Sequence, residues 1–140
     1  MNILIPVDGS PYSLKALAAA CDLAKSQTPS RLILTSVVVQ VPELEEGVYI
    51  SEKMKDQAEN ALAKAKDAVQ AKGLNHLHVV LATGPSPAHE IVQVAKDEAA
   101  DLIVIGSRGL SGKTLSFLGS TASQVVAYAP CSVLVVKSQD

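Results

Sequence analysis

The stretch Asn2-Ile3-Leu4-Ile5-Pro6-Val7-Asp8-Gly9-Ser10-Pro11 decides the fold of this chain. Its apolar run from residue 2 to residue 7 is typical of a strand that is buried on both faces. Asp8-Gly9 then marks a turn, Ser10 offers a hydroxyl that can cap a helix, and Pro11 suits the first helical position. A buried strand followed at once by a helix indicates an α/β fold.

The same alternation continues along the chain. After a helix over 11–26, strands are expected at 31–39, 76–82, 101–105 and 132–137, with a polar connection around 42–47. Helices are expected from 51 to about 73, from about 87, and over 120–128. This order predicts right-handed crossovers onto a largely parallel sheet with helices on both faces.

Apolar spacing predicts which sides of the helices are buried. In the first helix, Leu14, Leu17, Ala18, Cys21 and Ala24 recur at steps of three and four residues. In the third helix, we expect four residues to face the core, namely Ile91, Val92, Ala95 and Ala99.

Composition limits the class of protein. The 140 residues predict one domain, residues 1–140, and 48% hydrophobic content excludes a disordered chain. A net charge of -2 and four aromatic side chains argue against nucleic-acid partners. No apolar run approaches the ~20 residues that span a bilayer, so no membrane insertion is expected. Because no basic segment precedes the first strand, we expect a cytoplasmic protein.

Two loops carry unusual chemistry. Ligands of open α/β sheets bind beyond the carboxyl ends of the strands, which selects the loops after 2–7 and after 101–105. In the second loop, Gly106 and Gly109 allow close backbone approach, and Arg108 is one of two arginines in the chain. Residues 119–121 stand at the start of a helix whose N-H groups attract phosphate. The loop therefore predicts an anion cradle, and a glycine-rich surface loop without a ligand stays open as the alternative.

At these residues the chain resembles the ATP-binding branch of the universal stress protein family. The resemblance rests on the pattern Gly106-x2-Gly109-x9-Gly119-Ser120, together with residues 6–10 and 129–136. It implies a Rossmann-like α/β sandwich of three layers, with four helices and a five-stranded, mostly parallel sheet in the order 3-2-1-4-5. It also implies binding of an adenine nucleotide, a role under stress or growth arrest, and a homodimer.

The resemblance assigns residues to parts of the nucleotide. It implies that Asp8 lies near the ribose with Pro6 beside it, and that the backbone of Val37 meets the adenine ring. Residues 105–109 would wrap the ribose and phosphates, and residues 119–121 would cradle the phosphates. The implied site residues are thus Pro6, Asp8, Val37, Ile105, Gly106, Ser107, Arg108, Gly109, Gly119, Ser120 and Thr121.

Several alternatives stay open beside this prediction. Asp8 could instead serve as an anion at the N-terminus of the first helix. The ligand is expected to be ATP, or AMP or ADP, with Mg²⁺ if a metal takes part. The turn at 84–88 is one residue longer than is usual in the family, and Ser36 stands where many relatives carry His.

The residues do not establish an enzyme. They offer no evident pair of nucleophile and base, so binding is better supported than turnover. A slow ATP hydrolase, or a dimeric scaffold or chaperone-like adaptor without nucleotide, is the alternative. The apolar residues Val133, Leu134, Val135 and Val136 form the last strand, which we expect at a sheet edge where it would join a second copy.

Overall fold

The computed structural model describes residues 1–27, 29–43, 47–108 and 119–137. The strands are β1 (Asn2–Pro6), β2 (Arg31–Glu43), β3 (Gly47–Ile50), β4 (Leu77–Gly84), β5 (Leu102–Gly106) and β6 (Ser132–Val136). The helices are α1 (Pro11–Ser26), α2 (Glu52–Ala71), α3 (Pro87–Asp97) and α4 (Ser120–Tyr128).

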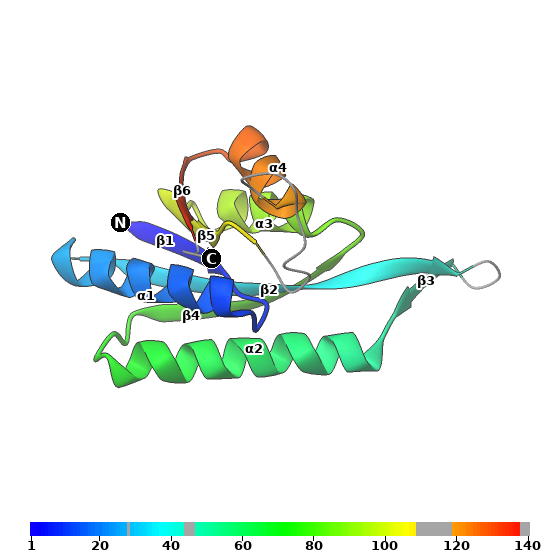
Figure 1. Cartoon of the computed structure of the whole chain (residues 1–140), viewed down its shortest axis with the longest axis horizontal. Helices are drawn as coiled ribbons and strands as arrows, with labels where there is room; N and C mark the ends of the chain where they lie inside the picture. The colour runs from blue at the N-terminus through cyan, green and yellow to red at the C-terminus, as the bar shows by residue number, and fades with distance from the viewer. Residues whose placement is uncertain (28, 44–46, 109–118, 138–140) are drawn as a thin grey trace.

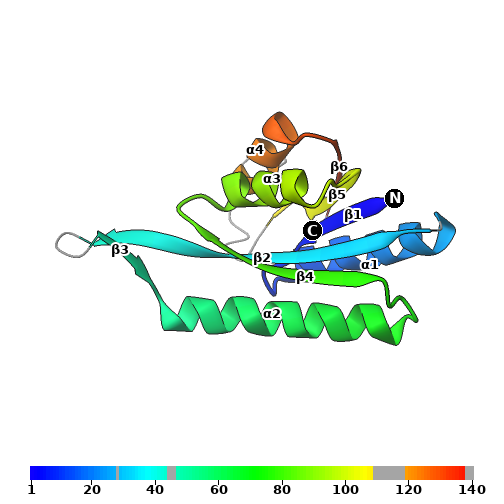
Figure 2. The same cartoon turned by 180° about the vertical axis from the view of Figure 1, so that it is seen from behind.

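Five parallel strands form the centre of the molecule, in the spatial order β4-β2-β1-β5-β6. This order confirms the predicted 3-2-1-4-5 arrangement of strands. Helices α1 and α2 lie on one face of the sheet, and α3 and α4 lie on the other, which gives the three predicted layers (Figures 1 and 2). The Rossmann-like α/β prediction is therefore confirmed.

A short sixth strand differs from the prediction. The segment expected as a polar connection instead extends β2 to Glu43, and β3 pairs with that extension in antiparallel fashion. Figure 1 shows this ribbon projecting beyond the helices. The pairing gives hydrogen-bond partners to backbone groups that leave the parallel sheet, which satisfies them better than an irregular loop would.

The centre of strand β1 is buried on both faces. Ile3, Leu4 and Ile5 are all 0% exposed. Because side chains alternate along a strand, Ile3 and Ile5 pack into the core beneath α1 and α2, whereas Leu4 packs into the core beneath α3 and α4. A single strand thus belongs to both hydrophobic cores.

The buried side of α1 is rotated from the predicted side. Leu17, Cys21 and Ala24 are buried as expected, but Leu14 is 49% exposed and Ala18 is also exposed. Ser13 is buried instead, because its hydroxyl donates to the Ser10 carbonyl over 3.1 Å and accepts the Asp8 N-H over 3.3 Å. These hydrogen bonds allow a polar side chain to take the inward position.

Helix α3 ends before Ala99, which was predicted to face the core. Ile91, Val92 and Ala95 are buried as expected, but the helix ends at Asp97. Ala99 lies in the turn beyond it with a φ of 51° and is exposed. Its side chain therefore does not face the core.

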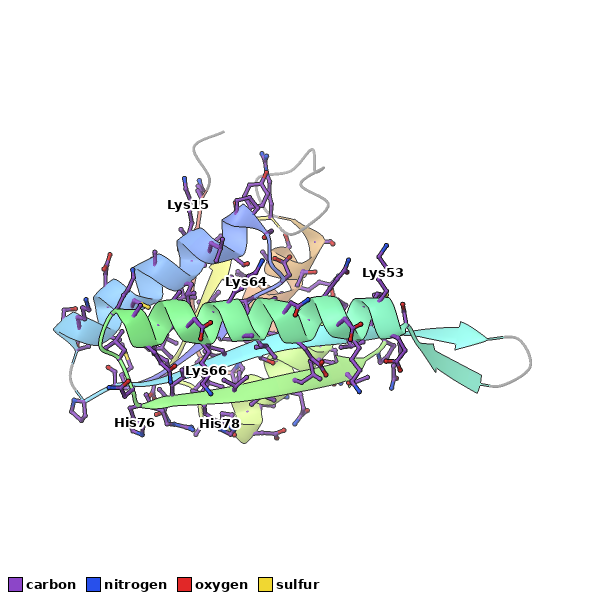
Figure 3. All side chains as sticks on the ribbon, turned by 90° about the horizontal axis from the view of Figure 1, so that it is seen from below. Lys15, Lys53, Lys64, Lys66, His76 and His78 are labelled. Atoms are coloured by element: carbon purple, nitrogen blue, oxygen red, sulfur yellow. The ribbon has the colours of Figure 1, made fainter. Side chains whose placement is uncertain are left out.

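Helix α2 presents a charged outer face to solvent. Lys53, Lys64 and Lys66 are exposed on this helix, which lies along the β2–β4 side of the sheet (Figure 3). Its inner face is formed by small and apolar residues such as Ala61 and Leu62. Within the described ranges, no helix is both long enough and apolar enough to cross a bilayer.

The difference in burial between Leu17 and Leu14 on α1 predicts that alanine substitutions at the two positions have different effects on stability. Leu17 is 3% exposed, so Leu17→Ala should lower the free energy of unfolding by about 2–5 kcal/mol, through lost transfer energy and the cavity left behind. Leu14→Ala on the same helix should change it by no more than about 0.5 kcal/mol. Urea unfolding measures both, and equal losses would contradict the observed rotation.

Candidate functional site

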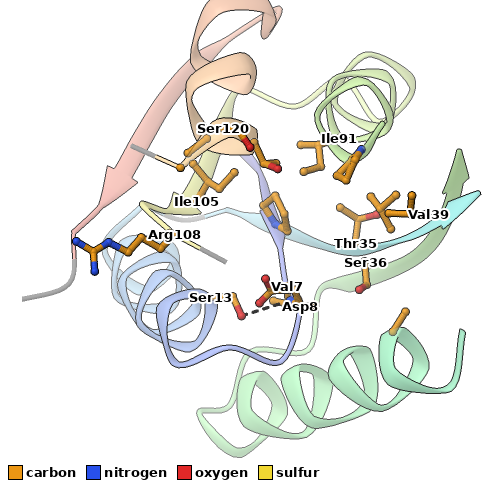
Figure 4. A pocket seen from close by; sticks show the side chains of 18 of the residues that line it. Val7, Asp8, Ser13, Thr35, Ser36, Val39, Ile91, Ile105, Arg108 and Ser120 are labelled. Carbon is orange, nitrogen blue, oxygen red and sulfur yellow. Dashed lines mark hydrogen bonds between the residues drawn. The ribbon is translucent and has the colours of Figure 1, made fainter. Parts of the chain in front are cut away.

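The strand order reverses at β1, which has β2 on one side and β5 on the other. A cavity of about 330 Å³ lies at the carboxyl ends of these strands. Figure 4 shows side chains from both faces of the sheet around it. Its lining includes the predicted residues Pro6, Asp8, Val37, Ile105, Gly106, Ser107, Arg108, Gly119, Ser120 and Thr121. Gly109 lies outside the described residues.

The turn after β1 fixes Asp8 at the cavity. The Ser10 N-H donates to Oδ1 of Asp8 over 2.9 Å, and the Asp8 N-H donates to Oγ of Ser13 over 3.3 Å. Gly9 between them has a φ of +85°, a conformation that glycine adopts without steric cost. Asp8 therefore serves the start of α1 and also lines the cavity, so the two predicted roles do not exclude each other.

Backbone contacts place the start of α4 beside the end of β5. The Gly119 N-H donates to the Ser107 carbonyl over 2.6 Å, and the Ser107 N-H donates to the Val136 carbonyl over 3.0 Å. A Cβ on Gly119 would lie 3.2 Å from the Ser107 carbonyl oxygen. The two ends of the predicted glycine-rich loop thus meet at the cavity.

The N-terminus of α4 differs from the other helix starts. The hydroxyls of Ser10, Ser51 and Ser86 each accept an N-H in the first turn of α1, α2 and α3. Helix α4 instead begins after Gly119, and no side chain of the described residues caps it. Among the described residues, no side chain therefore competes with an anion for its first N-H groups and positive dipole end.

The Arg108 guanidinium lies away from the other labelled cavity side chains (Figure 4). Its Cζ atom stands 6.0 Å from the centroid of the Tyr12 ring, at the distance limit of a cation-π contact. Arg108 lines the cavity, and its Cα would lie 3.6 Å from a Cβ on Gly119 at the start of α4. Its contact with phosphate stays a prediction.

The cavity has an apolar side that the sequence only partly predicted. Val37 and Val39 of β2 line it together with Pro87 and Ile91 of α3. Val39 could have been found from the alternation of side chains along β2, since it shares a face with Val37. Pro87 is the first residue of α3.

Helix α2 contributes residues that the sequence analysis missed. Met54, Gln57 and Ala58 line the cavity from this helix. Their positions depend on how α2 packs over β2, and no local motif indicates that packing. Ser36, noted as a departure from the family, also lines the cavity.

The other candidate residues form no second site in the described part of the chain. Burial raises the pKa of both the Cys21 and Cys131 thiols above its ordinary value, which keeps them protonated at neutral pH. His78 and His76 are exposed, and Nε2 of His78 lies 3.3 Å from Oε1 of Glu98. Among the described residues, no group of three histidine, cysteine or acidic side chains could hold a metal ion.

Comparison with known proteins agrees with this architecture. Residues 1–137 match the model of the universal stress protein family. The chain belongs to this family. Among its universal stress protein relatives, YxiE of Bacillus subtilis (strain 168) is 38% identical over 147 aligned positions, which cover 97% of this chain and 98% of that protein.

Solved universal stress protein structures share the fold along nearly the whole chain. UspA from Lactobacillus plantarum is 30% identical with a TM-score of 0.73, and the match covers 97% of each chain. A universal stress protein in complex with cAMP is 26% identical with a TM-score of 0.75, over 97% of this chain and 96% of that chain.

The close approach of α1 to β5 yields a prediction for Gly106. A Cβ at this position would lie 2.8 Å from the backbone oxygen of Tyr12, which cannot move without shifting α1. Gly106→Ala should therefore lower the free energy of unfolding by about 1–3 kcal/mol, and Gly106→Val should lower it further. Urea unfolding of both variants tests the contact, and unchanged midpoints would show that the backbones are not in contact.

Proposed function

We propose that this universal stress protein binds an adenine nucleotide, ATP in the first place, and acts as a regulator of the stress response in the cytoplasm. The observation that carries the proposal is the cavity at the reversal of strand order. There the Asp8 carboxylate lies in one lining with the N-terminus of α4, which no side chain of the described residues caps. A nucleotide has matching parts, because its phosphates are anionic and its ribose donates hydrogen bonds.

The polarity of the cavity orients the proposed ligand. Phosphates fit the N-terminus of α4, where the N-H groups of residues 120 and 121 follow Gly119. The carboxylate of Asp8 repels phosphate and accepts hydrogen bonds from ribose hydroxyls. The adenine ring then lies against the apolar side formed by Val37 and Ile91, with the Val37 backbone at its edge.

Relatives support an adenine nucleotide as the class of ligand. The universal stress protein solved with cAMP shares the fold of this chain along almost its whole length. AMP and ADP would use the same base and ribose contacts as ATP. Mg²⁺ would enter with the phosphates of ATP, as is usual for this ion, with the hydroxyls of Ser120 and Thr121 beside its bound waters.

Binding is proposed rather than turnover. Among the described residues that line the cavity, the ionisable groups are Asp8 and Arg108. Oδ1 of Asp8 accepts a backbone N-H, and the Arg108 guanidinium lies over Tyr12. Neither arrangement supplies the nucleophile and base pair that a hydrolase needs.

The nucleotide proposal is tested by ligand identification followed by titration. Mass spectrometry of the supernatant from denatured protein should find an adenine nucleotide, and calorimetry with ATP should show one site per chain. Gly119→Val should abolish ATP binding, because the new side chain would crowd the Ser107 carbonyl and the phosphate position. Ser123→Ala, on an exposed position of α4 outside the cavity lining, should bind as wild type.

We also propose a homodimer through β6. The strand lies at one edge of the parallel sheet, and Leu134 on it is 40% exposed. The Val136 carbonyl accepts the N-H of Ser107, so the backbone groups of Val136 face β5. Backbone groups point to alternate sides of a strand, so the N-H and C=O groups of Val133 and Val135 face the open edge. Two such edges can pair about a two-fold axis and bury the apolar run.

A proline pair tests the dimer. Val135→Pro removes an N-H that faces the open edge while leaving the bonds to β5, so it should give a folded monomer in sedimentation velocity. The matched variant is Val79→Pro on β4, at the opposite edge of the sheet. The Leu32 N-H donates to the His76 carbonyl, so the backbone groups of His76 face β2, and by alternation the N-H of Val79 faces the open edge. It should remain dimeric. A monomeric wild type, or a dimeric Val135→Pro variant, would contradict the proposed interface.

A further inference from the structure

The cavity has a second, polar side that faces α2. Ser36 lines this side and is 4% exposed, and its hydroxyl makes no hydrogen bond with the described residues. No buried polar atom of the described residues is both sealed from solvent and unpartnered, so this hydroxyl reaches the cavity space. A hydroxyl in this position offers one donor and two acceptor sites to a ligand.

The alternation of side chains along β2 explains the direction of Ser36. Leu32 and Leu34 pack into the core beneath α1 and α2, and Ser36 follows them on the same face of the strand. Val37 packs against the opposite core. Figure 4 agrees, because the Ser36 oxygen points toward α2.

Helix α2 adds a neutral amide to the lining of the same cavity. Gln57 lines the cavity from α2, and its side chain makes no hydrogen bond with the described residues. Ser13 offers less to a ligand, because its hydroxyl already donates to the Ser10 carbonyl and accepts the Asp8 N-H. The α2 side therefore presents a carboxylate from Asp8, a hydroxyl and an amide.

The carboxylate, hydroxyl and amide on the α2 side determine which part of a ligand can bind there. The carboxylate repels an anion, and no cationic side chain of the described lining points to this side, since the Arg108 guanidinium lies over Tyr12. Neutral donors and acceptors around a carboxylate suit two adjacent hydroxyl groups, which can each donate one hydrogen bond and accept another. The apolar ring of a base suits the α3 side better.

We infer that Ser36 and Gln57 bind the ribose hydroxyls beside Asp8, so that the cavity selects ribonucleotides over nucleotides that lack the ribose diol. This inference rests on the proposed nucleotide function and specifies which sugar the site accepts. Ser36 and Gln57 act here as specificity residues. The Ser36 hydroxyl enforces such selection because it is on a buried residue, and an analogue without the ribose hydroxyl leaves it unpaired. Gln57 is exposed, so its amide adds affinity for the diol more than it adds selection.

The test compares AMP with 2′,3′-dideoxyadenosine monophosphate by calorimetry in wild type, Ser36→Ala and Gln57→Ala. Wild type should bind AMP more tightly than the dideoxy analogue. Ser36→Ala should weaken AMP binding by about threefold to tenfold, the effect of one neutral hydrogen bond, and leave the dideoxy analogue unchanged. Gln57→Ala should act in the same direction. Such a cycle isolates the contact between side chain and diol.

Two control variants and the contrary outcomes complete the design. Asn60→Ala on an exposed position of α2, and Ser123→Ala on α4, lie outside the cavity lining and should leave both affinities unchanged. Equal affinity of wild type for the two ligands, or equal losses for both in Ser36→Ala, would overturn the inference while the nucleotide function stands. A wild type that binds neither ligand would overturn the proposed function and this inference together.

Discussion

Burial of β1 on both of its faces is the constraint on which the rest of the structure depends. Ile3 and Ile5 hold α1 and α2 to one face of the sheet, and Leu4 holds α3 and α4 to the other. Because both faces are covered, polar chemistry can gather only where the strand ends. Asp8 lies just beyond that end, and its contacts with Ser10 and Ser13 join the turn to the first helix.

The helices differ in how the backbone N-H groups of their first turns are hydrogen-bonded, and this difference bears on the cavity. Three helices begin with a serine hydroxyl that accepts their own first N-H groups, whereas α4 begins after Gly119 without a side-chain cap among the described residues. The start of this helix, at Ser120 and Thr121, lines the cavity. Gly106 allows the nearby approach of α1 to β5, since any side chain there would meet the Tyr12 backbone. Helix packing thus requires a glycine at position 106, and the start of α4 at the cavity has a glycine at position 119.

Much of the fold could be predicted because its signals are local. The apolar run at 2–7, the capping hydroxyl of Ser10 and the proline at 11 each act within a few residues of one another. The inward side of α1 was predicted less well, because a hydrogen-bonded Ser13 took a buried position while Leu14 was left exposed. The extension of β2 and its pairing with β3 were also missed, since polar residues at a turn do not show how far a ribbon continues.

The sequence by itself determined the alternation of strands and helices, the strand order implied by the family resemblance, and the loops from which the candidate site is built. Those properties depend on periodicity, capping and glycine positions along a short stretch of chain. The tertiary structure alone decided that Met54, Gln57 and Ala58 of α2 reach the same cavity as Ser36, and that the Arg108 guanidinium lies over the Tyr12 ring. These contacts depend on how helices pack across the sheet, which is set by side-chain shapes distant in sequence and therefore leaves no local pattern to read.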